Sequence, residues 1–268
     1  MGDKKHDPRE DASEVEPSYF ELQAYWGATK HMGGLKATKE LIELCHIDGE
    51  AQVLDVGCGV GATPCYIAKT HGCRVIGVDI SERMINRVHE RARREGVADR
   101  VELCVADAQS LPFQGCLFDA VIGESVLTFV RDKRRAVSEY VRVTRPSGYV
   151  GLNEEIWMKT PPQGLVEYSR RLWDIEAEIL TSESWEELLR ASGLRDIVAR
   201  LCRFKSSLGE YIEEIRRYSP RDYLSASYRA LALYLKSSAF RKYTKGRFTS
   251  LPKDFFEYMG YGIYVGRK

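Results

Sequence analysis

Short apolar runs alternate with amphipathic stretches through the middle of the chain. Runs of four to seven mostly apolar residues predict buried strands, and apolar residues at helical spacing predict helices packed on them. Strands are predicted at 53–56, 74–79, 101–106, 118–123 and 149–153. Helices are predicted at 62–70, between Ser81 and Gly96, and at 134–143. This order predicts an α/β, doubly wound, mostly parallel sheet with helices on both faces.

The flanking segments follow different patterns. Residues 1–16 are polar and charged, which predicts a disordered tail. Residues 17–50 predict N-terminal helices, interrupted at Gly33 and Gly34. Residues 51–268 predict the main domain, with helical insertions at about 158–181 and 208–258 and a last strand over 261–265.

Composition and charge exclude several classes of protein. The 40 Lys and Arg residues nearly balance the 39 Asp and Glu residues, which argues against a protein that binds nucleic acid through its overall charge. The sequence lacks a long apolar run and a signal-peptide core, so no transmembrane segment is expected. Seven cysteines without CxxC pairs predict reduced thiols in a cytoplasmic protein, with neither a disulfide framework nor a metal site.

A glycine-rich turn directly follows the first predicted strand. Asp55 ends the strand, and Gly57, Cys58, Gly59 and Gly61 follow. Glycines allow a sharp turn and leave bare backbone against which a ligand can lie at the carboxyl edge of the sheet. The turn also matches the dinucleotide-binding pattern in its alanine variant, so it does not by itself identify the ligand.

Two further acids follow neighbouring strands, as expected of a nucleoside site. Asp79 ends the second strand, where a carboxylate can accept hydrogen bonds from both ribose hydroxyls. Asp107 follows the third strand and can accept the exocyclic amine of adenine, while the Ala108 backbone N–H serves a ring nitrogen. Ile80 can pack on the purine, and Met84 joins the predicted cofactor-binding set from the next helix.

At these residues, the stretch from 53 to 149 resembles the class I S-adenosylmethionine-dependent methyltransferases. The glycine turn at 55–61, Asp79, Asp107 and the segment 145–148 occur in the family's order. The resemblance implies a Rossmann-like sheet of seven strands with the last strand antiparallel. It also implies S-adenosyl-L-methionine as the cofactor.

The N-terminal segment resembles the lid of small-molecule methyltransferases, including the phosphoethanolamine N-methyltransferases. The resemblance implies that Tyr25, or alternatively Tyr19, closes over the methionine end of the cofactor together with His31, Gly33 and Gly34. The acceptor pocket is predicted under the two helical insertions. The phosphoethanolamine enzymes carry a catalytic histidine at the position of Thr128, so this chain departs from their pattern.

Methyl transfer from a sulfonium is an in-line displacement that mainly requires alignment of the reactants. A base is needed only when the acceptor binds in its protonated form. Glu124, Glu154 and His31 are the candidates for binding a cationic acceptor or taking a proton, and Glu124 is also assigned to the cofactor. Glu155 is interpreted as a solvated loop carboxylate.

The sequence thus predicts methyl transfer to an N, O or C nucleophile of a small molecule. The alternatives are methylation of tRNA or protein and a regulator that binds the cofactor without turnover. An NAD-dependent oxidoreductase is a more distant fourth hypothesis. The segment after strand four lacks the motifs of nucleobase methylation, which argues against DNA and RNA. The basic stretch 216–247 predicts a solvated face, or contact with an anionic acceptor or a peripheral lipid surface. The oligomeric state stays open.

Overall fold

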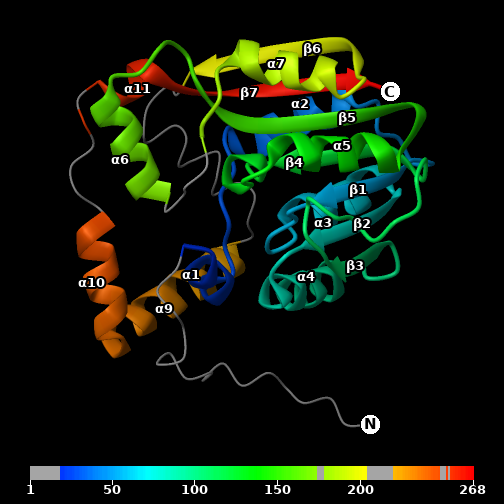
Figure 1. Cartoon of the computed structure of the whole chain (residues 1–268). Helices are drawn as coiled ribbons and strands as arrows, with labels where there is room; N and C mark the ends of the chain where they lie inside the picture. Colours follow the sequence, from blue (N-terminus) through cyan, green and yellow to red (C-terminus); the bar gives the residue numbers. More distant parts are fainter. Residues whose placement is uncertain (1–18, 174–177, 204–219, 248–251, 253) are drawn as a thin grey trace.

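The computed structural model describes residues 19–173, 178–203, 220–247, 252 and 254–268 (Figure 1). A seven-stranded sheet with the order β3-β2-β1-β4-β5-β7-β6 forms its centre. The strands are β1 (Gln52–Val56), β2 (Arg74–Asp79), β3 (Val101–Val105), β4 (Phe118–Glu124), β5 (Thr144–Trp157), β6 (Arg195–Arg203) and β7 (Met259–Arg267). Neighbours among β1 to β5 are parallel, and β7 is antiparallel to β5 and β6. The predicted fold is confirmed.

Helices cover both faces of the sheet and one edge. They are α1 (Tyr19–Trp26), α2 (Gly34–Leu44), α3 (Ala62–His71), α4 (Glu82–Glu95), the 3₁₀ turn η1 (Leu127–Phe129), α5 (Lys133–Val143), α6 (Gln163–Trp173), α7 (Ser182–Ala191), α9 (Pro220–Lys236), α10 (Ser238–Arg247) and α11 (Phe255–Tyr258). None of the described helices has the length and apolar character needed to cross a bilayer.

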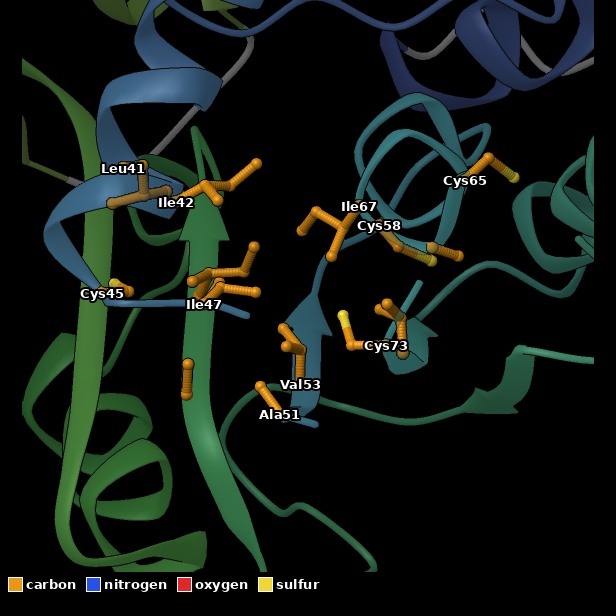
Figure 2. Close-up of a cluster of buried hydrophobic side chains, with 14 of the residues drawn as sticks. Leu41, Ile42, Cys45, Ile47, Ala51, Val53, Cys58, Cys65, Ile67 and Cys73 are labelled. Atoms are coloured by element: carbon orange, nitrogen blue, oxygen red, sulfur yellow. The ribbon is translucent and has the colours of Figure 1, made fainter. Parts of the chain in front are cut away.

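Two apolar cores lie on opposite faces of the sheet because successive strand residues point to opposite sides. On one face, α2, α3 and α4 pack on residues such as Val53 and Ile122 (Figure 2). On the other, α5 and α7 pack on residues such as Leu54 and Val121. Cys45, Cys58, Cys65 and Cys73 are buried in the first core, and all seven cysteines are free.

The fourth helix shows how local sequence places a cleft wall. Ser81 caps α4 by accepting a hydrogen bond from the Met84 backbone N–H, and Gly96 ends the helix in a left-handed conformation, as expected of both residues. Its apolar face then packs on the sheet, and its first turn lies next to the end of β2. The sequence pattern therefore predicted the bounds of this element.

The structure differs from the expected elements in β5. The strand begins at Thr144 and continues to Trp157, so it is longer than the predicted 149–153. Its register shifts against β4 between Phe118 and Ala120, which accommodates the turn at 145–148 within the strand. The predicted tail 1–16 lies outside the described residues, as do 174–177, 208–219, 248–251 and 253 within the insertions. The division into lid and main domain stays a prediction.

A separate helical layer forms around α1. Helices α9 and α10 lie beside α1 at one edge of the molecule (Figure 1). Leu22 and Tyr25 of α1 pack with Leu233 of α9 and Phe240 of α10. The N-terminal helix is thus joined to a segment 200 residues later in the chain.

Candidate active site

A cleft of about 880 Å³ lies at the carboxyl ends of β1, β2, β3 and β4. Helix α1 and residues 29–31 border it on one side, and the first turn of α4 borders it on another. Its volume is near the upper end of the range for small-molecule sites, so it can hold a nucleoside-sized ligand and a second small molecule. The predicted residues that line it are His31, Asp55, Gly57, Cys58, Gly59, Asp79, Ile80, Met84, Asp107, Ala108 and Glu124.

The glycine turn presents bare backbone to the cleft. Gly57 has a φ of 72°, and a β-carbon there would clash with Val126. Gly59 has a φ of 53°, and a β-carbon there would lie 2.9 Å from Thr29 Cγ2. Larger residues would therefore strain the turn and displace the cleft walls.

Asp79 fixes this turn while facing the cleft. One carboxylate oxygen accepts a hydrogen bond from Gly59 N–H at 2.9 Å and the other from Ser81 N–H at 3.0 Å. Burial raises the pKa of Asp79, and these backbone hydrogen bonds partly offset that effect. A carboxylate oxygen can accept more than one hydrogen bond, so both oxygens of Asp79 can also receive donors from a ligand.

Asp107 and Ile80 border the cleft near the end of β3. Asp107 accepts a hydrogen bond from the Gln109 backbone N–H at 2.8 Å, which orients its carboxylate within the turn after the strand. The Ile80 side chain is 73% exposed although it is large and apolar, and it lines the cleft. An apolar side chain in this position can pack on a flat ring.

Glu124 ends β4 and forms a buried polar group in the cleft wall. Thr63 donates a hydrogen bond to Glu124 Oε2 at 2.7 Å. Thr38 Oγ1 lies 3.1 Å from Glu124 Oε1 and 3.0 Å from His31 Nε2, and His31 Nε2 lies 3.5 Å from Glu124 Oε2. The three partners come from α2, α3 and the segment before α2, so tertiary packing holds this carboxylate in one orientation.

Hydrogen bonds tie the segment around His31 to the sheet. Asn153 of β5 donates to the Met32 carbonyl at 2.7 Å, and Ser125 Oγ accepts from the Met32 N–H at 3.2 Å. His31 Nδ1 lies 3.1 Å from the same carbonyl. The other ring nitrogen, Nε2, lies near Thr38 and Glu124.

Comparisons with known proteins agree with this geometry. Residues 54–152 match the family model described as "Methyltransferase domain". An uncharacterized protein of Haemophilus influenzae is 31% identical over 62% of this chain and 66% of its own length. Phosphoethanolamine N-methyltransferase 1 of Arabidopsis thaliana is 28% identical over 62% of this chain and 33% of its own length. The 27-O-demethylrifamycin SV methyltransferase of Amycolatopsis mediterranei is 26% identical over 91% and 88%.

The chain carries a class I S-adenosylmethionine-dependent methyltransferase domain at residues 54–152. Its fold is similar to that of Haemonchus contortus phosphoethanolamine N-methyltransferase 2, solved with phosphomonomethylethanolamine and S-adenosylhomocysteine, with a TM-score of 0.70 at 21% identity over 92% of this chain and 57% of that one. The [4+2]-cyclase SpnF has a TM-score of 0.66 at 22% identity over 95% and 97%. The chain spans about a third of the length of the Arabidopsis enzyme and 57% of the Haemonchus enzyme.

The cleft residues fit the family's cofactor, S-adenosyl-L-methionine. Asp79 can accept hydrogen bonds from ribose hydroxyls, and the same cleft is lined by the apolar side chain of Ile80 and the carboxylate of Asp107. The glycine turn has no room for side chains, so a ligand can approach its backbone. The carboxylates of Asp55 and Glu124 give this end of the cleft the negative charge that suits a cationic sulfonium and ammonium group.

Four predicted residues lie in the structure around the cleft without lining it. Tyr25 packs in the cluster between α1, α9 and α10, and the side chain of Tyr19 lies outside the described part. Gly33 caps α2 with a φ of 74°, next to Gly34, and a β-carbon on it would lie 2.5 Å from Tyr261 Oη. Gly61 caps α3 and packs on Val88. Their placement favours supporting roles, and their predicted part in cofactor binding stays untested.

Glu154 is also absent from the cleft lining, and its side chain is fully buried. Its oxygens accept hydrogen bonds from the backbone N–H groups of Val126, Leu127 and Thr128 and from the Thr128 hydroxyl, at 2.8–3.0 Å. Burial raises the pKa of Glu154, and these donors lower it in part. The carboxylate caps η1 and thereby positions Val126 beside the glycine turn, which differs from the expected catalytic position.

Sequence reasoning missed several residues of the cleft. Neither Thr38 of α2 nor Thr63 of α3 was assigned to the site from the sequence. A buried threonine at a helical core position is the signal that could have indicated a polar partner inside the fold. Phe20 and Phe129 meet edge to face at 4.8 Å between ring centroids on the cleft border, and no local pattern joins positions so far apart.

Proposed function

We propose that this protein transfers a methyl group from S-adenosyl-L-methionine to a small-molecule acceptor. The observation that carries the proposal is the arrangement of Asp79 and Asp107 at neighbouring strand ends, with Glu124 beside the bare glycine turn. When bound, the cofactor supplies an electrophilic methyl group on a sulfonium leaving group. The chain's own task is then to hold the acceptor in line and to exclude water.

Glu124 and His31 are the residues proposed to meet the acceptor. Both are buried and line the cleft, and Thr38 and Thr63 hold the carboxylate in place. Together they can orient a cationic group or receive a proton from the acceptor. Glu154 is proposed to act through the backbone of 126–128 as a positioning residue.

An acceptor other than a phosphobase is favoured. Thr128 stands where the phosphoethanolamine enzymes have their catalytic histidine, and its hydroxyl donates to Glu154 at 2.9 Å. Thr128 is buried and does not line the cleft, so it does not substitute for that histidine. A small molecule remains the proposed acceptor in a cytoplasmic setting, where the seven free thiols are stable.

Isothermal titration with S-adenosylhomocysteine tests the cofactor site. We expect binding by the parent protein and a loss of affinity of at least about tenfold in Asp79→Ala, because charge-assisted hydrogen bonds contribute about 1.5–3 kcal/mol. Asp99→Ala, which removes an exposed carboxylate from the loop before β3, is the matched control and should bind like the parent. No binding by a folded parent protein would overturn the assignment.

Methyl transfer itself is tested by incubating the protein with labelled S-adenosylmethionine and a metabolite extract. A labelled small molecule whose formation requires Glu124 or His31 is the expected result. Binding of the cofactor with no label in any product would instead favour a regulator without turnover. Label in RNA or protein would favour a macromolecular acceptor.

A further inference from the structure

Helix α9 carries an exposed apolar stripe along almost its whole length. Leu224, Tyr228, Leu231 and Leu235 are 57–73% exposed and are spaced by four, three and four residues. This spacing places them on one side of an α-helix. Five of the eleven large apolar side chains exposed in the described part of the chain lie on α9, when Tyr234 is included. Such a concentration of apolar surface indicates a contact site.

The opposite side of α9 is attached to the rest of the molecule. Ala226 and Leu233 are buried, and Arg229 donates hydrogen bonds to the Trp26 carbonyl at the end of α1. Asp222 forms an ion pair with Arg94 of α4 at 2.8 Å. The helix therefore keeps its apolar stripe directed away from the protein, at the edge formed by α1, α9 and α10 (Figure 1).

The surroundings of the stripe are basic. Residues 220–247 contain seven Lys or Arg residues and one acid, Asp222, by direct count. That acid is paired with Arg94 on the attached side of the helix. Arg221 and Lys236 are exposed at the two ends of the stripe, and Lys245 of α10 is exposed as well. Within the described helices α9 and α10, exposed basic residues flank the apolar stripe and the one acid lies on the attached side. An apolar stripe flanked by basic residues is typical of helices that lie in a membrane interface.

We propose that the α9 stripe docks this protein on an anionic lipid surface. The four apolar side chains would enter the boundary between headgroups and acyl chains, and the basic residues would meet the lipid phosphates. The spacing would also suit pairing with α9 of a second copy, but such a pair would bring two strongly basic segments together. Charge complementarity therefore favours the lipid surface. This inference does not depend on methyl transfer.

Vesicle co-sedimentation of the full chain tests the proposal. We expect at least tenfold stronger binding to vesicles of 30% phosphatidylglycerol in phosphatidylcholine than to pure phosphatidylcholine, with release at 0.5 M salt. The double variant Leu224→Ser/Leu231→Ser should lose at least tenfold of the binding. The matched control is Leu201→Ser, which makes the same change at a leucine of β6 that is 49% exposed, and it should bind like the parent.

Binding of S-adenosylhomocysteine and thermal melting, measured on each variant, show whether the fold is retained. The serine substitutions are on exposed positions, so both should stay at the parent values. Equal binding to anionic and neutral vesicles, or undiminished binding by the folded double variant, would overturn the proposal. Analytical ultracentrifugation that showed a dimer dissociated by the double variant, without binding to vesicles, would overturn it in favour of a second copy.

Discussion

Adjacent carboxylates at Glu154 and Glu155 have different environments because they point to opposite faces of β5. Glu154 accepts several hydrogen bonds, whereas Glu155 Oε2 is buried and has no hydrogen-bond partner among the described residues. Burial, together with the charge of Glu154, raises the pKa of Glu155 to about 8. The interpretation of Glu155 as a solvated loop carboxylate was wrong, since its side chain is 2% exposed within a strand.

This environment predicts a pH-dependent gain of stability in Glu155→Gln. Between an ordinary pKa of 4.5 and the raised value of about 8, the folded protein keeps a proton that the unfolded chain releases. The free energy of unfolding therefore falls as the pH rises through this window. We expect Glu155→Gln to be more stable than the parent by on the order of a few kcal/mol at pH 8, with little difference near pH 4.5.

Urea unfolding at several pH values measures this effect. Glu102→Gln, which removes an exposed carboxylate from β3, is the matched control. An equal difference between parent and Glu155→Gln at all pH values would show that Glu155 titrates alike in the folded and unfolded states.

At the scale of elements, the ends of strands and helices build the cleft. The turn after β1 requires glycine for two separable reasons, which are its positive φ and the close approach of Val126. Gly96, at the end of α4, has almost the same φ of 73° but no atom within 4 Å of an added β-carbon. The two positions therefore allow the cost of the backbone conformation to be separated from that of the contact.

We predict that Gly96→Ala lowers the free energy of unfolding by about 1–2 kcal/mol, the cost of a left-handed conformation. Gly57→Ala should cost roughly 2 kcal/mol more, because the added methyl group overpacks the contact with Val126. The double variant Gly57→Ala/Val126→Ala should recover that extra part in urea unfolding. If Gly57→Ala and Gly96→Ala lower the free energy of unfolding equally, the turn after β1 moves enough to accommodate the added methyl group, and the contact with Val126 adds no cost.

At the scale of the whole molecule, α1 is held in place by a distant part of the chain. Arg229 of α9 binds the Trp26 carbonyl, while Trp26 and Phe240 meet edge to face at 5.8 Å between ring centroids. Arg87 of α4 donates to the Ala24 and Tyr25 carbonyls at 3.1 and 3.2 Å. Burial and the charge of Arg87 lower the pKa of Arg229. Helix α1 borders the cleft, so α9 stabilises one of its walls.

Arg229→Ala should loosen α1 while leaving the sheet intact. We expect amide hydrogen exchange over residues 19–26 to become at least about tenfold faster, since hydrogen bonds to charged groups contribute about 1.5–3 kcal/mol. Binding of S-adenosylhomocysteine should weaken several-fold. Arg190→Ala, which removes an arginine paired with Glu186 on the surface of α7, is the control for loss of a positive charge. Unchanged exchange in α1 would show that α9 does not hold it.

The sequence by itself determined the sheet and the cofactor end of the cleft. Apolar periodicity located the strands of the parallel part, and glycines and acids after β1, β2 and β3 indicated the nucleoside site. The prediction succeeds because the carboxyl ends of neighbouring parallel strands lie at the same edge of the sheet. Once the fold gives the order of the strands, residues that follow neighbouring strands are expected to lie close together. Asp79 and Asp107 lie on the cleft for this reason.

The other contacts around the cleft were decided only by the tertiary structure. Thr38 and Glu124 are 86 positions apart, and the packing of α2 on the sheet brings them together. The inward burial of Glu155 depends on the continuation of β5 beyond residue 153 to Trp157. Tyr25 faces α9 because a segment 200 residues later covers it. Such contacts depend on long-range packing, for which a local pattern of apolar and polar residues carries no signal.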